Sequence, residues 1–351
     1  MDLSALALCG PCPSGVQGKP QRPPKVTSHP IDAANRRLSH AHSALFLRIS
    51  YPPGEMNNEH LESLRKAGRI ARDCREWARE NIKPGVRLAH ILETVEDMIA
   101  KEGAAPAFPA QTSRNHVTAH YCSAPGDEQI YEEGDCVKVD VGVHVDGWVA
   151  DNACTVDLST DGRWGELIKA SEDALKAAIA TVAIGVQVSE IGANVEAVIQ
   201  ARGFEPVRNL TGHGVARWKV HCAPQIPSYR EGHERLRQGM IIAIEPFAST
   251  GVGMITERGK AEVFMLVRPP RKAKGIDKDL LNAIQSWRGL PIARRYFNEF
   301  SPQVLEDTLT KLARQGSLVR FPPLVESAGV MTAQTEHTMI VGDEGPEVIT
   351  A

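Results

Sequence analysis

The chain has 351 residues, of which 42% are hydrophobic and 24% charged, and its formal net charge is −3. This length can hold one large domain or two ordinary ones, and either could bury a sizeable core. The charge balance argues against binding to nucleic acid or acidic membranes through overall charge. The longest apolar runs are too short for a transmembrane helix.

Residues 1–55 are rich in Pro, Ser, Gly and His and have few periodic apolar positions, so we expect a disordered or irregular extension. Met56 precedes the first strong helical pattern and is a candidate for the true start. The short run Leu3 to Cys9 lacks a preceding basic residue, which argues against a signal peptide. The seven scattered cysteines fit a reducing compartment, and we expect a cytoplasmic protein.

Cys9 and Cys12 form a C-x-x-C motif like that of thioredoxin. In such a motif a strand precedes and a helix N-terminus follows, because the helix stabilises the thiolate. Here Pro13 follows and no strand pattern precedes, so we interpret the motif as coincidental.

Helical periodicity begins after residue 56. Asn57 or Asn58 can cap a helix whose apolar positions run from Leu61 to Trp77, and a second helix spans Leu88 to Ile99. Residues 82–103 resemble residues 182–203 at an offset of 100, with glycines matching near both ends. Two unrelated amphipathic helices could share periodicity, but the glycines favour a duplication. We therefore predict two similar halves with a cleft between them.

Strands are predicted at 137–145, 148–158, 240–248, 262–267 and 337–342. A mainly helical insertion is expected at about 270–330, so the main domain of residues 56–351 would contain a helical, winged-helix-like subdomain.

The segment from Val137 to Leu158 contains two alternating strands around Asp146-Gly147, a dipeptide suited to a two-residue hairpin turn. If Val145 faces Trp148, Asp151 lies opposite Gly142, and Asp140 lies diagonally on the same face. Carboxylates among inward valines are costly unless a cation compensates them. The hairpin alone favours a metal site only slightly over an acidic outer face.

Four further residues could complete such a site. His213 lies between glycines, which we interpret as a tight turn that leaves the imidazole uncrowded, and His221 follows eight residues later. Glu245 ends a strongly apolar strand, and Glu336 begins another apolar run. One histidine and four carboxylates suit a pair of divalent ions such as Mn, Fe, Co or Zn better than a structural zinc.

These segments together resemble the type II methionine aminopeptidases. The resemblance runs from about residue 57 to 342 and rests on the order and spacing of several motifs. They are AFP at 107–109, AHY at 119–121, the D-x10-D hairpin, GHG, AIEPF, GLPIARRYF at 289–297, RFPPL at 320–324 and AQTEHT. Thr335 stands where we expect a larger side chain, which predicts looser packing beside Glu336.

The resemblance implies an α/β pita-bread fold with two pseudo-symmetric halves, and removal of the first methionine from nascent proteins whose second residue is small. It implies five ligands for two divalent ions, with Glu245 also as general base and then acid. His120 and His221 would flank the substrate, and Phe108 and Val220 would line the methionine pocket. The implied ligands are Asp140, Asp151, His213, Glu245 and Glu336, with Asp151 and Glu336 bridging both ions.

Two other functions remain open at this stage: cleavage of Xaa-Pro bonds by a peptidase of the same fold, and a non-catalytic relative that binds RNA or the ribosome. The first usually requires a large extra N-terminal domain, and the second loses metal ligands. We expect peptide N-termini as substrates, leave the ribosome open as a partner, and predict a monomer without a membrane or direct nucleic-acid site.

Overall fold

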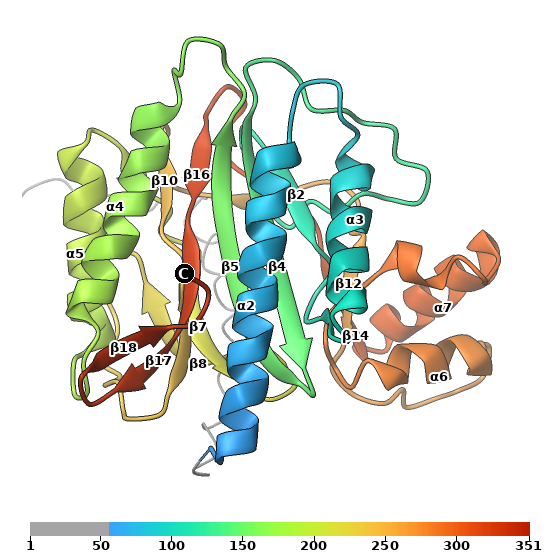
Figure 1. Cartoon of the computed structure of the whole chain (residues 1–351). Helices are drawn as coiled ribbons and strands as arrows, with labels where there is room; N and C mark the ends of the chain where they lie inside the picture. The colour runs from blue at the N-terminus through green and yellow to red at the C-terminus, as the bar shows by residue number, and fades with distance from the viewer. Residues whose placement is uncertain (1–55) are drawn as a thin grey trace, which may run out of the picture.

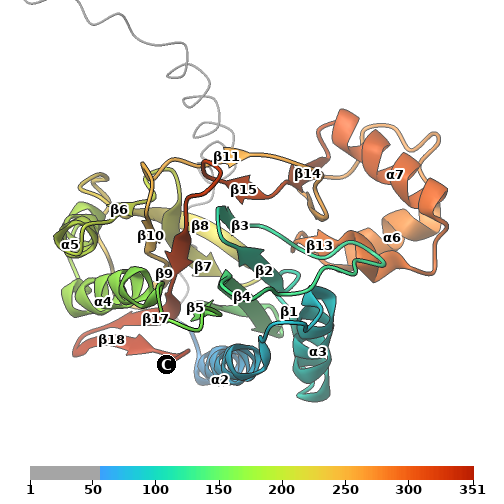
Figure 2. The ribbon, with the colours of Figure 1, turned by 90° about the horizontal axis from the view of Figure 1, so that it is seen from above.

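The computed structural model describes residues 56–351. The predicted extension at residues 1–55 and the interpretation of the Cys9-x-x-Cys12 motif lie outside these residues. Four helices cover one face of a nine-stranded antiparallel sheet, as the two views of Figures 1 and 2 show together. These helices are α2 (Asn58–Asn81), α3 (Leu88–Lys101), α4 (Gly165–Thr181) and α5 (Val188–Ala201).

The central sheet has the strand order β1-β4-β5-β17-β9-β7-β8, with β2 paired to β4 and β18 paired to β17. The last long strand of the chain therefore lies between strands of the two halves. The bounds are β1 (Ala105–Pro106), β2 (Gln111–Arg114), β4 (Cys136–Val145), β5 (Trp148–Asp157), β7 (Thr211–Ala216), β8 (Lys219–Pro227), β9 (Ile241–Ile244), β17 (Glu336–Gly342) and β18 (Gly345–Val348).

The other strands of residues 56–351 form three smaller sheets, each of three strands. Their strands are β3 (Val117–Ala119), β6 (Glu205–Pro206), β10 (Phe247–Ser249), β11 (Thr256–Glu257), β12 (Val263–Leu266), β13 (Ile292–Ala293), β14 (Leu318–Phe321), β15 (Leu324–Val325) and β16 (Thr332–Gln334). Residues 270–330 contain α6 (Lys278–Ser286), a 3-10 turn η1 (Arg294–Phe297) and α7 (Pro302–Arg314), together with β13, β14 and β15. This region therefore has more strand than the sequence patterns predict, and α6 and α7 lie to one side of the sheet (Figure 2).

Helix α2 begins where the sequence predicts. Asn57 is the N-cap, and its side-chain oxygen accepts a hydrogen bond from the backbone N–H of His60 at 2.8 Å. The periodic face is buried because Leu64, Ala67 and Cys74 pack into the first hydrophobic core. A second core lies under α4 and α5, so each half buries its own helix pair against the sheet.

The offset of 100 is visible in the structure. Helix α5 has the bounds of α3 plus 100, and β6 has the bounds of β1 plus 100. Gly85 and Gly185 both have φ of +86°, a conformation that glycine adopts without strain. The two halves therefore share local geometry as well as periodicity, which supports the predicted duplication.

Close packing of α5 on the second half gives a first test. A β-carbon added at Gly192 would lie 2.2 Å from the carbonyl oxygen of Tyr229 and 2.4 Å from that of Pro227. We expect Gly192→Ala to lower the free energy of unfolding by about 1–3 kcal/mol, measured by urea denaturation, because the backbone must move. Gly165→Ala is the matched control, since nothing lies within 4 Å of its β-carbon position. Equal effects of both substitutions would contradict this packing.

Candidate metal centre

The β4–β5 hairpin has the register predicted from its turn. Asp146 and Gly147 have φ of +51° and +84°, Val145 pairs with Trp148, and Gly142 pairs with Asp151. The predicted turn and register are confirmed.

Strand pairing places Asp140 and Glu336 on either side of Ala153. Asp140 pairs with Ala153 across β4–β5, and Glu336 pairs with Ala153 across β17–β5. Residues directly opposite one another in a sheet point to the same face, as do residues two apart in one strand. Asp151 therefore joins Asp140 and Glu336 on the face away from the helices.

The second half supplies His213 and Glu245 to the same face. His213 on β7 pairs with Ala243 on β9, and Glu245 is two residues beyond Ala243, directly after the end of that strand. Since β17 pairs with β9 as well as with β5, the sheet brings all five predicted ligands together. They come from both halves and from the last long strand.

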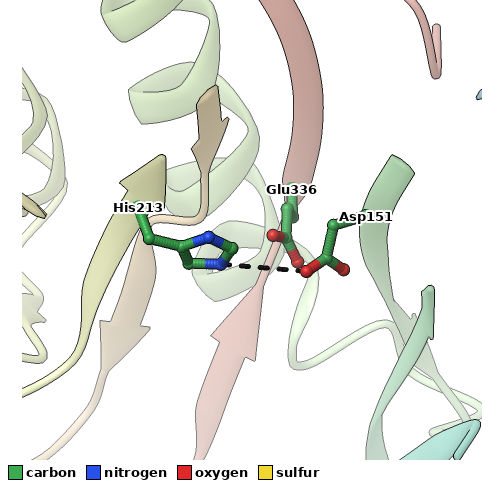
Figure 3. A group of neighbouring side chains, drawn as sticks. All are labelled: Asp151, His213 and Glu336. Carbon is green, nitrogen blue, oxygen red and sulfur yellow. Dashed lines mark ion pairs between the residues drawn. The ribbon is translucent and has the colours of Figure 1, made fainter. Parts of the chain in front are cut away.

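Side-chain distances show how compact this group is. The Nε2 atom of His213 lies 3.7 Å from Oδ2 of Asp151 and 3.7 Å from Oε1 of Glu245. One ligand atom from each of Asp151, His213 and Glu336 lies within 4.8 Å of the others, and all three side chains are buried (Figure 3). Side-chain atoms this close can share a metal ion.

The tautomer of His213 also suits a metal ligand. Its Nδ1 atom lies 3.2 Å from the carbonyl oxygen of Gly214, and a carbonyl can only accept. Nδ1 therefore carries the hydrogen, and in the neutral ring Nε2 presents its lone pair to the carboxylates. Burial lowers the pKa of His213 to about 4, so the ring is neutral at physiological pH.

The carboxylates destabilise one another when no cation is present. Burial raises the pKa of Asp140 to about 7, and burial together with the neighbouring acids raises those of Asp151, Glu245 and Glu336 well above their usual values. Among the described residues, one oxygen each of Asp140, Asp151 and Glu336 is buried without a hydrogen-bond partner. Unpartnered buried carboxylate oxygens around a neutral imidazole are the ligand set of a divalent cation, so the residues fit a metal centre.

Two supporting residues escaped the sequence analysis. Gln334 donates from Nε2 to Oδ2 of Asp140 at 3.3 Å and to Oε2 of Glu336 at 3.4 Å. The hydroxyl of Thr338 donates to the backbone carbonyl of Asp151 and accepts from its N–H, both at 2.8 Å. Both residues lie two positions from Glu336 and share its face, so strand parity within AQTEHT was a signal for them.

The glycines beside His213 have a different role from the predicted one. His213 lies inside strand β7 rather than in a tight turn, and β7 and β8 were not among the predicted strands. A β-carbon at Gly212 would lie 2.6 Å from the carbonyl oxygen of Ala243, and one at Gly214 would lie 2.1 Å from that of Ala223. The glycines thus allow neighbouring strands to approach closely.

Thr335 makes a hydrogen bond that the sequence analysis did not predict. Its hydroxyl lies 2.8 Å from that of Ser171 on α4, and Ser171 itself donates to the carbonyl of Ile168. The Thr335 hydroxyl is therefore the donor of this bond, which ties the residue before Glu336 to a buried helix position.

A cavity of about 670 Å³ opens onto the metal centre. His213 and His221 meet edge to face with ring centroids 4.3 Å apart, and His120 meets Phe321 in the same way at 5.7 Å. Phe108 and Val220 are buried in its wall. All nine residues selected from the sequence line this cavity: Phe108, His120, Asp140, Asp151, His213, Val220, His221, Glu245 and Glu336.

Comparison with known proteins agrees with this site. Residues 62–342 match the sequence profile of Metallopeptidase family M24. A methionine aminopeptidase of Archaeoglobus fulgidus is 41% identical over 297 residues, which cover 84% of this chain and 100% of that protein. The chain belongs to metallopeptidase family M24 and, within it, to the methionine aminopeptidases.

Solved structures show how widely the fold is shared. A methionine aminopeptidase from Thermotoga maritima has a TM-score of 0.61 at 24% identity, covering 86% of this chain and 98% of that one. A prolidase from Pyrococcus furiosus has a TM-score of 0.56 at 19% identity, covering 84% and 64%. The expected pita-bread fold is confirmed. Because both kinds of enzyme have it, the fold alone does not select between their activities.

The electrostatics of the centre predict an unusual pH dependence for the metal-free protein. The folded state holds a proton on Asp140 that the unfolded chain releases, because the pKa rises from 3.8 to about 7 on folding. The contribution of Asp140 to stability in the presence of a chelator therefore falls as pH rises from about 4 to about 7, whereas that of His213, whose pKa is lowered to about 4, rises over the same range. Urea unfolding across this range measures it.

Excess Mn²⁺ should remove this fall, since a cation favours the ionised carboxylates. Relative to the unchanged protein, Asp140→Asn should gain stability in chelator as pH rises through the same range. A stability difference between the two proteins that does not change with pH would contradict the raised pKa of Asp140.

Proposed function

We propose that this chain removes the N-terminal methionine from newly made proteins when the second residue is small. The observation that carries the proposal is the convergence of Asp140, Asp151, His213, Glu245 and Glu336 on one buried face that opens into a cavity. Relatives named methionine aminopeptidase, about 40% identical over most of the chain, support the same substrate.

The five converging residues would hold two divalent ions drawn from Co, Mn, Fe and Zn. Asp151 and Glu336 are the proposed bridging ligands. This is supported by the closeness of their ligand atoms to one another and to Nε2 of His213. Two such cations supply a nucleophilic water at neutral pH and polarise the substrate carbonyl.

Proton transfer would fall to Glu245. Its carboxylate reaches within 3.7 Å of His213 and lines the cavity. A carboxylate held at that place can accept a proton from the attacking water and return it to the leaving amine. Glu245 is therefore proposed both as a ligand and as general base, then acid.

The two histidines beside the centre would orient the peptide bond. His221 packs against His213 and would stabilise the developing oxyanion, while His120 would hydrogen-bond near the scissile amide. Phe108 and Val220 would line the pocket for the methionine side chain, which their burial in the cavity wall supports.

Residues 270–330 are proposed as a subdomain inserted into the peptidase domain. No helix among residues 56–351 is long and apolar enough to cross a membrane. A cytoplasmic monomer acting on nascent chains, with the ribosome as a partner, is the setting that we propose for this activity.

Turnover of the peptides Met-Ala-Ser and Leu-Ala-Ser, with Mn²⁺ and with chelator, tests the proposal. We expect cleavage of the first peptide to exceed that of the second by at least about tenfold, because a pocket selects side chains by shape. Activity should disappear when the metal is removed. Equal rates, or turnover that survives complete removal of metal, would sink the idea.

The ligand set has its own test. His213→Ala should reduce bound metal and lower the rate by a factor on the order of 10² or more, because the site loses the imidazole among its proposed ligands. His90→Ala is the control, since His90 is exposed on α3.

Preference for an Ala-Pro dipeptide over Met-Ala would instead assign the chain to Xaa-Pro cleavage.

A further inference from the structure

The internal repeat places a glutamate at the same position of two helices. Glu96 lies on α3 and Glu196 lies on α5, at the offset of 100. In the second half, Oε1 of Glu196 accepts a hydrogen bond from Nη2 of Arg208 at 2.8 Å. Arg208 belongs to the same half and lines the cavity, so this half provides its own partner for the glutamate.

The first half cannot do the same, because Phe108 occupies the position equivalent to Arg208. The backbone confirms the equivalence: the N–H of Ala107 bonds to the carbonyl of Gly142, and the N–H of Val207 bonds to that of Phe247. A phenyl ring cannot pair with a carboxylate. Glu96 receives its cation from the insertion (residues 270–330), where Nη2 of Arg295 lies 2.5 Å from its Oε1.

The same oxygen of Glu96 joins the insertion to the cavity wall. It accepts a hydrogen bond from the hydroxyl of Tyr296 at 2.6 Å and from the backbone N–H of Ala110 at 3.0 Å. Nη1 of Arg295 lies 2.8 Å from Sγ of Cys122, two residues after His120. Arg295 is only 8% exposed, so little solvent screens its pairing with Glu96.

Residues 107–111 are held at three points as a result. Ala107 bonds to Gly142, Ala110 bonds to Glu96, and Gln111 pairs with Asp140 in the sheet. Phe108 lies between these points. Its ring occupies the space beside Gly142, since a β-carbon added at Gly142 would lie 2.1 Å from a ring atom of Phe108. Removing the middle attachment frees the backbone two residues from Phe108.

We infer that Arg295 is a positioning residue for recognition of the substrate's first side chain. Arg295 holds Glu96, and Glu96 fixes the backbone of residues 107–111. The shape of the pocket at Phe108 therefore depends on the insertion. This inference rests on the proposed function for the part that concerns the substrate. The mechanical link from Arg295 through Glu96 to Ala110 is independent of any activity. Arg295 touches none of the five metal ligands in the described contacts, so metal binding should not require it.

Hydrogen–deuterium exchange measures the mechanical link directly. In Arg295→Met and Glu96→Leu, the amides of residues 107–111 should exchange faster than in the unchanged protein, with Ala110 changing most. Arg294→Met is the matched control, because Arg294 is adjacent and bonds to Glu262 and Glu306 rather than to Glu96. Unchanged exchange in Arg295→Met, or equal acceleration in Arg294→Met, would overturn the inference.

Steady-state kinetics on Met-Ala-Ser and Leu-Ala-Ser with the metal-loaded protein measures the effect on recognition. We expect Arg295→Met to raise KM for Met-Ala-Ser and to lower the ratio of kcat/KM for the two peptides by about tenfold, with kcat nearly unchanged, because the pocket loses its fit. Bound metal, measured by elemental analysis, should stay constant, and Arg295→Lys should restore part of the selectivity.

The double variant Glu96→Leu/Arg295→Met should lose no more selectivity than the stronger single variant, since both residues act through one link. Additive losses, or a fall in kcat with lost metal, would overturn the inference. If the unchanged protein cleaves neither peptide, the proposed function fails, while the exchange experiment still decides the link.

Discussion

The rest of the structure is organised around the burial of four carboxylates beside one neutral imidazole. Such a group is unfavourable in a protein interior unless a cation balances it, because desolvation and mutual repulsion both oppose ionisation. The sheet holds the acids together through antiparallel pairing around Ala153, whose small side chain leaves room between Asp140 and Glu336. Packing of four helices on the opposite face stabilises this arrangement.

Local signals made part of the site predictable from the sequence. The Asp146-Gly147 turn determines the register of its hairpin, so the positions of Asp140 and Asp151 follow from counting residues. Glu245 follows one apolar strand and Glu336 begins another. Because side chains alternate along a strand, the position of each glutamate determines which face of the sheet it lies on. Long-range pairing is different: nothing local indicates that β17 lies between β5 and β9. Only the resemblance to a known family implied that the five ligands converge.

Strands β7 and β8 show why the remainder was missed. Gly212, Gly214 and Pro224 lie within them, and these residue types are rare in strands. Glycine is needed there because carbonyl oxygens of neighbouring strands occupy the space that a β-carbon would take, a constraint that exists only in the folded state. The partners of Glu96 likewise come from almost 200 residues away, at 295 and 296, beyond the reach of any periodic pattern.

The place of β17 has a consequence for how the protein matures during synthesis. Its first residue, Glu336, completes the ligand set, and the strand follows both halves and the insertion in the sequence, so it is synthesised after them. Until then, β5 and β9 lack the strand that joins them, and the acids of the first half have no partner from the end of the chain. A growing polypeptide therefore cannot possess the finished centre before β17 has been synthesised and has paired with β5 and β9.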